Sequence, residues 1–119
     1  MPQYAVFLHF PADRIADEPD PEALAAHTAH SEELRRKGVM VFGAPLADRT
    51  ATTSIRGGVV TDGPFTETHE VVVGFYVIDV PSLDEALELA RQNPINAQGG
   101  GVEVRPVQPI ESSTGGVTA

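Results

Sequence analysis

The sequence predicts one domain of the α+β class. Three features carry this prediction: five segments with strand-like apolar patterns, two segments with helix start signals, and an order in which both helices lie between strands. With 119 residues, 41% of them hydrophobic and 21% charged, the chain is typical of a globular domain rather than a disordered one. We expect this domain to span residues 1–110. Residues 111–119 are mostly Ser, Thr and Gly and are expected to form a disordered tail.

The first half of the chain predicts a strand, a helix and a second strand. Residues 3–10 carry large apolar side chains on both alternating faces, which predicts a strand. Asp20 is a good N-cap and Pro21 suits the first helical position, so a helix should begin there. It should end before Gly38, because basic residues gather in its last turn and glycine favours the position after a helix. Residues 39–43 predict the next, short strand.

Two further strands are expected before the second helix. Residues 52–60 predict a strand that Gly57–Gly58 interrupts. The apolar run at 71–80 is the strongest strand of the chain, because both of its faces are apolar. A strand of this kind is expected at the centre of a sheet, covered on both sides.

A helix and an edge strand complete the domain. Ser82 and Glu85 form a capping box at the start of the second helix. Helical spacing predicts that this helix buries one stripe, made of Leu83, Ala86, Leu87 and Ala90. The last strand, near 102–107, contains Pro106, which favours a sheet edge or the end of a strand.

This order of elements predicts a ferredoxin-like βαβ-ββαβ sandwich, with both helices on one face of an antiparallel sheet. Two helices cover only one face, yet the strands at 3–10 and 71–80 are apolar on both. A second copy of the same chain is the simplest cover for the other face. We therefore expect a homodimer in which the two sheets face each other.

Composition excludes several kinds of function. The chain has no cysteine, so disulfides, thiolate nucleophiles and cysteine-bound metals are ruled out. A formal net charge of −9 disfavours binding to nucleic acid or to anionic lipid. No apolar stretch reaches the length of a membrane span and no secretory signal opens the chain, so a cytoplasmic location is expected. The Gly57–Gly58 pair and the glycine triplet at 99–101 lead into strands rather than helices, so they do not predict phosphate binding.

The histidines are the candidates for acid–base chemistry. His27 falls on the inward stripe of the first helix, where it is either a packed histidine or a general acid or base beside a cleft. His9 lies on the first strand, on the face opposite Tyr4, and the same two interpretations apply. His30 follows His27 at a spacing at which the two could share a metal ion, but no further ligand is placed by the sequence. His69 stands in a polar stretch, which predicts a solvated side chain, and no metal site is expected.

The segment at 61–68 is the most specific local pattern. Asp62, Gly63 and Pro64 are typical turn residues, so a structural role for Asp62 is one interpretation. Phe65 follows at once, and an aromatic side chain on a loop needs a pocket. A functional role for this segment is the alternative.

The same segment gives the chain its resemblance to a known family. Residues 61–65 together with Glu67, the run 74–79, the run 83–86 and the run 100–106 resemble the DGPF branch of the YCII-related proteins over nearly the whole chain. This resemblance implies a dimeric α/β barrel of ferredoxin-like protomers. It also implies likeness to cofactor-free isomerases, dehydrochlorinases and monooxygenases that act on small, often aromatic compounds.

The resemblance extends to single residues. Members of the family carry a helix histidine followed by a leucine and a glycine, and His27 with Leu34 and Gly38 matches this spacing. They also carry an Asp before a Pro after the second helix, where this chain has Asn93. An amide cannot balance a positive imidazole as a carboxylate does, so Asp62 is the substitute partner that we consider.

Three functional hypotheses follow. In the first, the chain is a cofactor-independent enzyme for isomerisation, elimination or dehydrochlorination of a small molecule, with His27 as general acid or base and Asp62 orienting it or the substrate. The residues expected to line its pocket are His9, Phe65, Glu67 and Tyr76. In the second, the chain is a non-catalytic dimeric binding or regulatory module, which the association of some relatives with sigma-factor-type regulators implies. In the third, the motif is purely structural.

Overall fold

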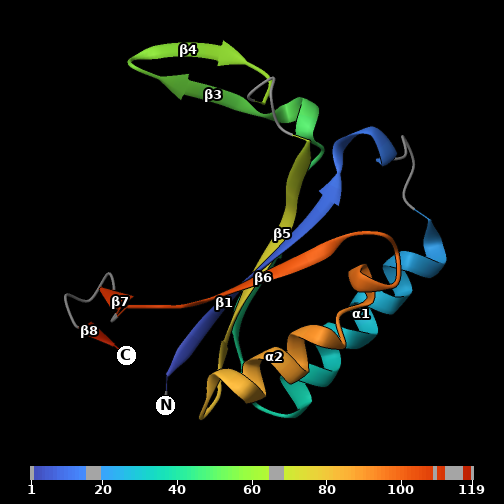
Figure 1. Cartoon of the computed structure of the whole chain (residues 1–119), viewed down its shortest axis with the longest axis vertical. Helices are drawn as coiled ribbons and strands as arrows, with labels where there is room; N and C mark the ends of the chain where they lie inside the picture. Colours follow the sequence, from blue (N-terminus) through green and yellow to red (C-terminus); the bar gives the residue numbers. More distant parts are fainter. Residues whose placement is uncertain (1, 16–19, 65–68, 109, 112–116, 119) are drawn as a thin grey trace.

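A computed structural model describes residues 2–15, 20–64, 69–108, 110–111 and 117–118 (Figure 1). The elements follow in chain order as β1 (Gln3–Pro11), η1 (Ala12–Arg14), α1 (Pro21–Arg36), β2 (Met40–Pro45), η2 (Arg49–Ala51), β3 (Thr53–Arg56), β4 (Val59–Asp62), β5 (Glu70–Asp79), α2 (Leu83–Arg91), η3 (Pro94–Asn96), β6 (Gly101–Pro106), β7 (Ile110–Glu111) and β8 (Val117–Thr118).

The body of the protein is a four-stranded sheet in the order β2-β5-β1-β6. Each neighbouring pair in it is antiparallel, so β1 and β2, which flank β5, run in the same direction, as do β5 and β6. This is the ferredoxin-like α+β arrangement that the sequence predicts. The prediction of a central strand at 71–80 is also correct, because β5 lies between β2 and β1. The strand with Pro106 is an edge strand, as expected.

The ends of α1 follow the predicted signals. The Asp20 carboxylate accepts a hydrogen bond of 3.0 Å from the backbone N–H of Glu22, and Pro21 occupies the first turn. Gly38 has a φ of 72°, a left-handed conformation that glycine adopts without strain and that terminates the helix.

Both helices pack against one face of the sheet. The core on that face joins apolar residues of β1 and β5 to Leu34 of α1 and to Ala86 and Ala90 of α2. The prediction for α2 was wrong at two positions: Leu83 and Leu87 are 45% and 39% exposed. The small alanines, spaced four residues apart, face the sheet and allow α2 to approach it closely, and this turns the two leucines outward.

The segment 52–60 is not a strand of the main sheet. β3 and β4 form a separate antiparallel hairpin, which projects from the end of the sheet and which we name the arm (residues 53–62; Figure 1). Gly57 and Gly58 have φ values of 57° and 80°, the left-handed pair that a two-residue hairpin turn requires. The pair therefore reverses the chain, whereas it was predicted only to interrupt one strand.

The other face of the sheet, which we name the outer face, is not covered by either helix. Phe7, Phe42 and Phe75 gather on it from three adjacent strands. The ring centroids of Phe7 and Phe75 are 6.5 Å apart, and those of Phe42 and Phe75 are 5.9 Å apart. The two-faced apolar character of β1 and β5 is therefore real in the folded chain.

The C-terminal stretch contains one short pairing in its described part. Ile110–Glu111 pairs with Val117–Thr118 as β7 and β8. Residues 112–116 and 119, on which most of the predicted disordered tail falls, lie outside the described residues. Among the described helices, none is long and apolar enough to cross a membrane.

Candidate functional site

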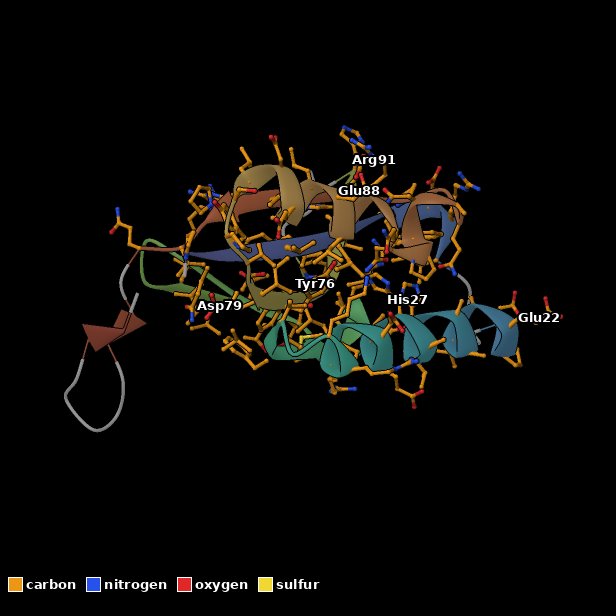
Figure 2. All side chains as sticks on the ribbon, turned by 90° about the horizontal axis from the view of Figure 1, so that it is seen from below. Glu22, His27, Tyr76, Asp79, Glu88 and Arg91 are labelled. Carbon is orange, nitrogen blue, oxygen red and sulfur yellow. The ribbon has the colours of Figure 1, made fainter. Side chains whose placement is uncertain are left out.

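The first candidate site lies between α1 and the loop that leads into β6. His27 projects from the inner side of α1 and is half-buried (Figure 2). Its Nε2 atom is 3.0 Å from the side-chain oxygen Oε1 of Gln98. An amide oxygen only accepts hydrogen bonds, so in this arrangement Nε2 carries the proton and donates. In the neutral ring the lone pair is then on the other nitrogen, Nδ1.

Gln98 is held in place by the turn that precedes β6. Its backbone N–H donates to the carbonyl of Ile95 at 3.1 Å, and the N–H of Gly100 donates to the same carbonyl at 3.0 Å. Gly99 between them has a φ of 98°. Packing of α1 against η3 brings this turn beside the helix, so the contact joins elements that are distant in the sequence.

Asn93 has a different role from the one that the family pattern implied for its position. Its side-chain oxygen accepts a hydrogen bond of 2.9 Å from the backbone N–H of Ile95, which caps η3. The residue is buried. The hydrogen-bond partner of the His27 side chain is Gln98.

His30 lies one turn after His27 and contacts Tyr76 of β5. The two rings meet edge to face with centroids 6.3 Å apart. The Nε2 atom of His30 is buried and makes no hydrogen bond. Burial lowers the pKa of His30, and the nearby His27 and Lys37 lower it further, against the opposing effect of Glu33. His30 is therefore a neutral imidazole at neutral pH.

Tyr76 is buried on the same face of the sheet. Burial raises the pKa of its phenol, while the Asn93 side chain lowers it. Its hydroxyl group thus stays protonated and can donate a hydrogen bond. Gly43 allows this position, because a Cβ atom at residue 43 would lie only 2.8 Å from the Cβ of Tyr76.

His9 does not join these residues. It lies on the outer face, where its Nε2 is 2.5 Å from Oε1 of Glu103. The neighbouring strand register places Glu103 opposite Phe7, so both side chains share that face. The sheet therefore separates His9 from Tyr76 and His27, although the sequence analysis expected His9 and Tyr76 in one pocket.

Asp62 is exposed and lies at the end of β4, in the arm. The backbone geometry at Gly63 agrees with the interpretation of residues 62–64 as a turn. Gly63 has a φ of 97°, its N–H donates to the carbonyl of Thr52 at 2.6 Å, and its carbonyl accepts from the Ser54 hydroxyl at 2.7 Å. Within one chain Asp62 is not brought to His27. Phe65 and Glu67 lie outside the described residues.

A second feature is a concavity on the other side of the sheet. It has a volume of about 500 Å³ and is lined by His9, Glu70, Gly101, Val102 and Glu103. In the described part of the chain, no three carboxylate or imidazole side chains come together in a way that suits a metal ion.

Comparison with known proteins identifies the family. The model of the YCII-related domain matches residues 3–111. The chain belongs to the YCII-related family. One relative with a similar sequence is the uncharacterised protein R00369 of Rhizobium meliloti (strain 1021), which is 46% identical to this chain over 69 residues. That match covers 54% of this chain and 56% of the relative, so it spans little more than half of either protein.

A solved structure shows the same fold as this YCII-related chain. It is 5-chloro-2-hydroxyhydroquinone dehydrochlorinase (TftG) from Burkholderia phenoliruptrix AC1100, in complex with 2,5-dihydroxybenzoquinone. The TM-score is 0.51 at 18% identity, and the superposition covers 91% of this chain and 95% of the dehydrochlorinase. At this level of identity the likeness concerns the fold.

Sequence reasoning missed Gln98 as the partner of His27. Gln98 stands in a loop 71 positions away, and a lone glutamine beside glycines has no local signal. The position of His30 beside His27 did have a local signal in the sequence. His30 follows His27 by three residues, and residues at this spacing share a helix face.

Proposed function

We propose that this YCII-related protein is a cofactor-independent enzyme that moves protons on a small organic molecule. The reaction class is isomerisation or elimination, with loss of hydrogen chloride as one form of elimination. Membership of the family and a fold shared with a dehydrochlorinase support this class. The observation that carries the proposal is the contact between His27 and Gln98, because in a neutral imidazole it puts the proton on Nε2 and the lone pair that can accept a proton on Nδ1.

His27 acts as the general base and then as the general acid. Its Nδ1 takes a proton from a carbon of the substrate, and the electron pair of the broken C–H bond forms a new double bond. In an isomerisation, the new double bond displaces the electron pair of an existing adjacent double bond, and that pair takes the proton back from the imidazolium at another carbon. In an elimination, the new double bond expels chloride from the neighbouring carbon, and the imidazolium loses its proton to solvent.

Tyr76 and His30 supply the polar surroundings of this step. A protonated phenol and a neutral imidazole in a buried layer can hydrogen-bond an oxygen of the substrate. Such an oxygen gains negative charge when a neighbouring carbon loses a proton. Gln98 fixes the ring of His27 without ion-pairing with it, because its amide is uncharged.

Asp62 is the predicted catalytic residue that one chain does not bring to His27, and a homodimer offers a second way to place it. The outer face carries Phe7, Phe42 and Phe75, and the arm carries Ile55, Val59 and Val60, which are 64%, 65% and 63% exposed. We propose that a second copy covers both, giving the dimeric α/β barrel of the family. Asp62 belongs to the arm and is not brought to His27 of its own chain. If it acts beside a His27, that His27 belongs to the partner copy.

The test is turnover of a defined panel of chlorinated hydroxyhydroquinones, hydroxylated quinones and enolisable acids. Chloride release and exchange of carbon-bound hydrogen in D₂O are followed by ion chromatography and proton NMR. We expect at least one compound to react, and His27→Gln to lower the rate by about 10²–10⁴-fold. His69→Gln, which changes an exposed histidine, is the matched control and should retain full activity.

An enzyme that is equally active with His27→Gln would refute the assignment of the base. If no compound of the panel reacts or exchanges, the proton-transfer function on this substrate class is wrong, and a binding role for the chain gains support.

A further inference from the structure

Asn93 is a polar residue in the interior of the fold. It is 4% exposed, whereas amide and charged side chains mostly lie at a protein surface. It stands between α2 and η3, two elements that pack on the helix side of the sheet. Burying an amide costs free energy unless its hydrogen-bonding groups find partners. The partners of Asn93 therefore indicate what the buried amide does.

Three hydrogen bonds lead from the Asn93 side chain to the ring of His27. The Oδ1 atom of Asn93 accepts from the backbone N–H of Ile95 at 2.9 Å. The carbonyl of Ile95 accepts from the backbone N–H of Gln98 at 3.1 Å. The side-chain oxygen of Gln98 then accepts from Nε2 of His27 at 3.0 Å. The position of Gln98 thus depends on Ile95, and the position of Ile95 depends on the Asn93 side chain.

Asn93 is itself fixed at the end of α2. Its backbone N–H donates to the carbonyl of Ala90 at 3.1 Å. Its own carbonyl accepts from the side-chain amide of Asn96 at 3.2 Å, and that amide also donates to the carbonyls of Ala90 and Arg91. The two asparagines therefore act in opposite directions along the chain. Asn96 ties η3 back to α2, whereas the Asn93 side chain fixes the part of η3 that leads to Gln98.

His27 reaches this turn from a separate element. α1 packs against η3, and the contact between His27 and Gln98 joins the two (Figure 2). Hydrogen bonds between nitrogen and oxygen fall between about 2.7 and 3.2 Å, so a displacement of about 0.5 Å weakens such a contact. A small movement of η3 relative to α1 is therefore enough to release the imidazole.

The Asn93 side chain also acts on Tyr76. Burial raises the pKa of the Tyr76 phenol, and the nearby Asn93 side chain lowers it. The same buried amide therefore lies close to the phenol and is connected to His27 through Gln98. It links two of the groups that the proposed reaction uses.

We propose that Asn93 is a positioning residue for the His27 site. Its side-chain oxygen holds Ile95, Ile95 holds the turn that carries Gln98, and Gln98 fixes the imidazole. This role rests on the proposed function, because it concerns the same site. It requires an acceptor atom at residue 93 and no negative charge. The direct pairing of residue 93 with the histidine, which the family resemblance implied, would instead require a carboxylate.

The test is NMR of the full-length protein labelled with nitrogen-15, without substrate and at a pH where the His27 ring is neutral. Asn93→Ala removes the acceptor. We expect the backbone amide hydrogen of Gln98 to exchange with solvent about fivefold faster, the usual order of effect when a capping side chain is lost. We also expect the share of the His27 proton that resides on Nε2 to fall.

Two conservative variants should restore the parent behaviour. Asp and Ser are as good as Asn at capping positions, so Asn93→Asp and Asn93→Ser each supply an acceptor for the N–H of Ile95. Both should keep the Gln98 exchange rate within about twofold of the parent and keep the proton on Nε2. Asn96→Ala is the matched control. It removes the hydrogen bonds of Asn96 to the end of α2 and should lower stability while leaving the His27 proton on Nε2.

The proposal is overturned if folded Asn93→Ala keeps both the exchange rate of Gln98 and the Nε2 proton of the parent. Equal changes in Asn93→Ala and Asn96→Ala would also overturn it, because Asn93 would then only stabilise the fold. So would loss of the Nε2 proton in folded Asn93→Ser, a result that decides the question even where Asn93→Ala does not fold.

The charge at residue 93 separates this role from direct pairing. If Asn93→Asp alters the titration of the His27 ring and Asn93→Ser does not, residue 93 acts on the histidine directly and the proposal is wrong. None of these measurements requires turnover. An inactive parent that shows the expected NMR results would refute the proposed reaction and leave the positioning role of Asn93 in place.

Discussion

The imidazole of His27 is 3.0 Å from the side-chain oxygen of Gln98, a residue 71 positions later in the chain. The contact fixes the plane of the ring and the nitrogen that carries the proton. It joins α1 to the turn before β6, two elements that the ferredoxin-like topology brings together on the helix side of the sheet. The chemistry proposed for His27 depends on this one hydrogen bond.

Replacing Gln98 by leucine should therefore release the tautomer of His27. In the parent protein, nitrogen-15 NMR of the side chain is expected to show the proton on Nε2. Gln98→Leu should give a mixture of the two tautomers and lower turnover by about tenfold, with little loss of stability. Gln92→Leu, which removes an exposed amide at the end of α2, is the control and should change neither. A tautomer equilibrium that is the same in both variants would exclude Gln98 as the orienting residue.

His30 should make the stability of the protein depend on pH. Burial lowers its pKa in the folded state below the ordinary value of 6.5. Below pH 6.5 the unfolded chain therefore binds this proton more readily than the folded chain, and the free energy of unfolding falls as the pH falls. Above this pH both states are neutral at His30 and the effect vanishes.

His30→Phe should remove this dependence. Phenylalanine keeps a ring against Tyr76 and eliminates a buried nitrogen that lacks a hydrogen bond, so we expect a gain of about 1 kcal/mol at pH 7. Urea unfolding between pH 5 and pH 7.5 measures both effects, with His69→Phe as the comparison. Equal slopes against pH in the parent and in His30→Phe would show that another group is responsible.

Much of the fold was predictable from local signals. Asp20 and Gly38 mark the ends of α1 through their own chemistry, and the alternation in β1 and β5 does not depend on distant residues. The arm was missed because a Gly57–Gly58 pair is compatible both with one interrupted strand and with a hairpin turn. Only the pairing of the flanking strands decides between these two structures. The orientation of α2 depends on how closely alanines let it approach the sheet, which no periodicity specifies.

The site was less predictable than the fold. His27 was singled out because histidine is the side chain that titrates near neutrality and because it matches the helix histidine of the family, and its catalytic role stays a prediction. Gln98 was missed because its role comes from a contact across the fold. His9 was correctly placed on the face opposite Tyr4, but its predicted pocket also included Tyr76, which lies on the other face of the sheet.

The corrected orientation of α2 can be measured. Ala86 is fully buried against the sheet, so Ala86→Leu should lower the free energy of unfolding by about 1–3 kcal/mol through overpacking. Leu87 is partly exposed on the side of α2 that is turned away from the sheet. Leu87→Ala should therefore lower the free energy of unfolding by less than about 1 kcal/mol. Denaturant unfolding of the two variants gives the answer. The opposite ranking would restore the helix face that the sequence analysis expected.

The proposed homodimer makes a prediction for the outer face. Phe42 is 49% exposed in the single chain and packs on Phe75, so Phe42→Asp should weaken self-association at least 100-fold. Leu24→Asp introduces the same charge on α1, where Leu24 is 52% exposed, and should have no such effect. Sedimentation velocity over a range of concentrations separates the two. Dissociation caused by Leu24→Asp but not by Phe42→Asp would place the interface on the helices instead.

NMR titration of the His27 side chain tests the central claim most directly. The resonances of its ring are followed while 2,5-dihydroxybenzoquinone and other hydroxylated or enolisable compounds are added in turn. We predict that at least one compound shifts these resonances saturably, and that folded His27→Gln binds the same compound more weakly and does not transform it. A His27 ring that responds to none of the compounds, together with a His27→Gln variant that fails to fold, would show that His27 is a packed structural residue.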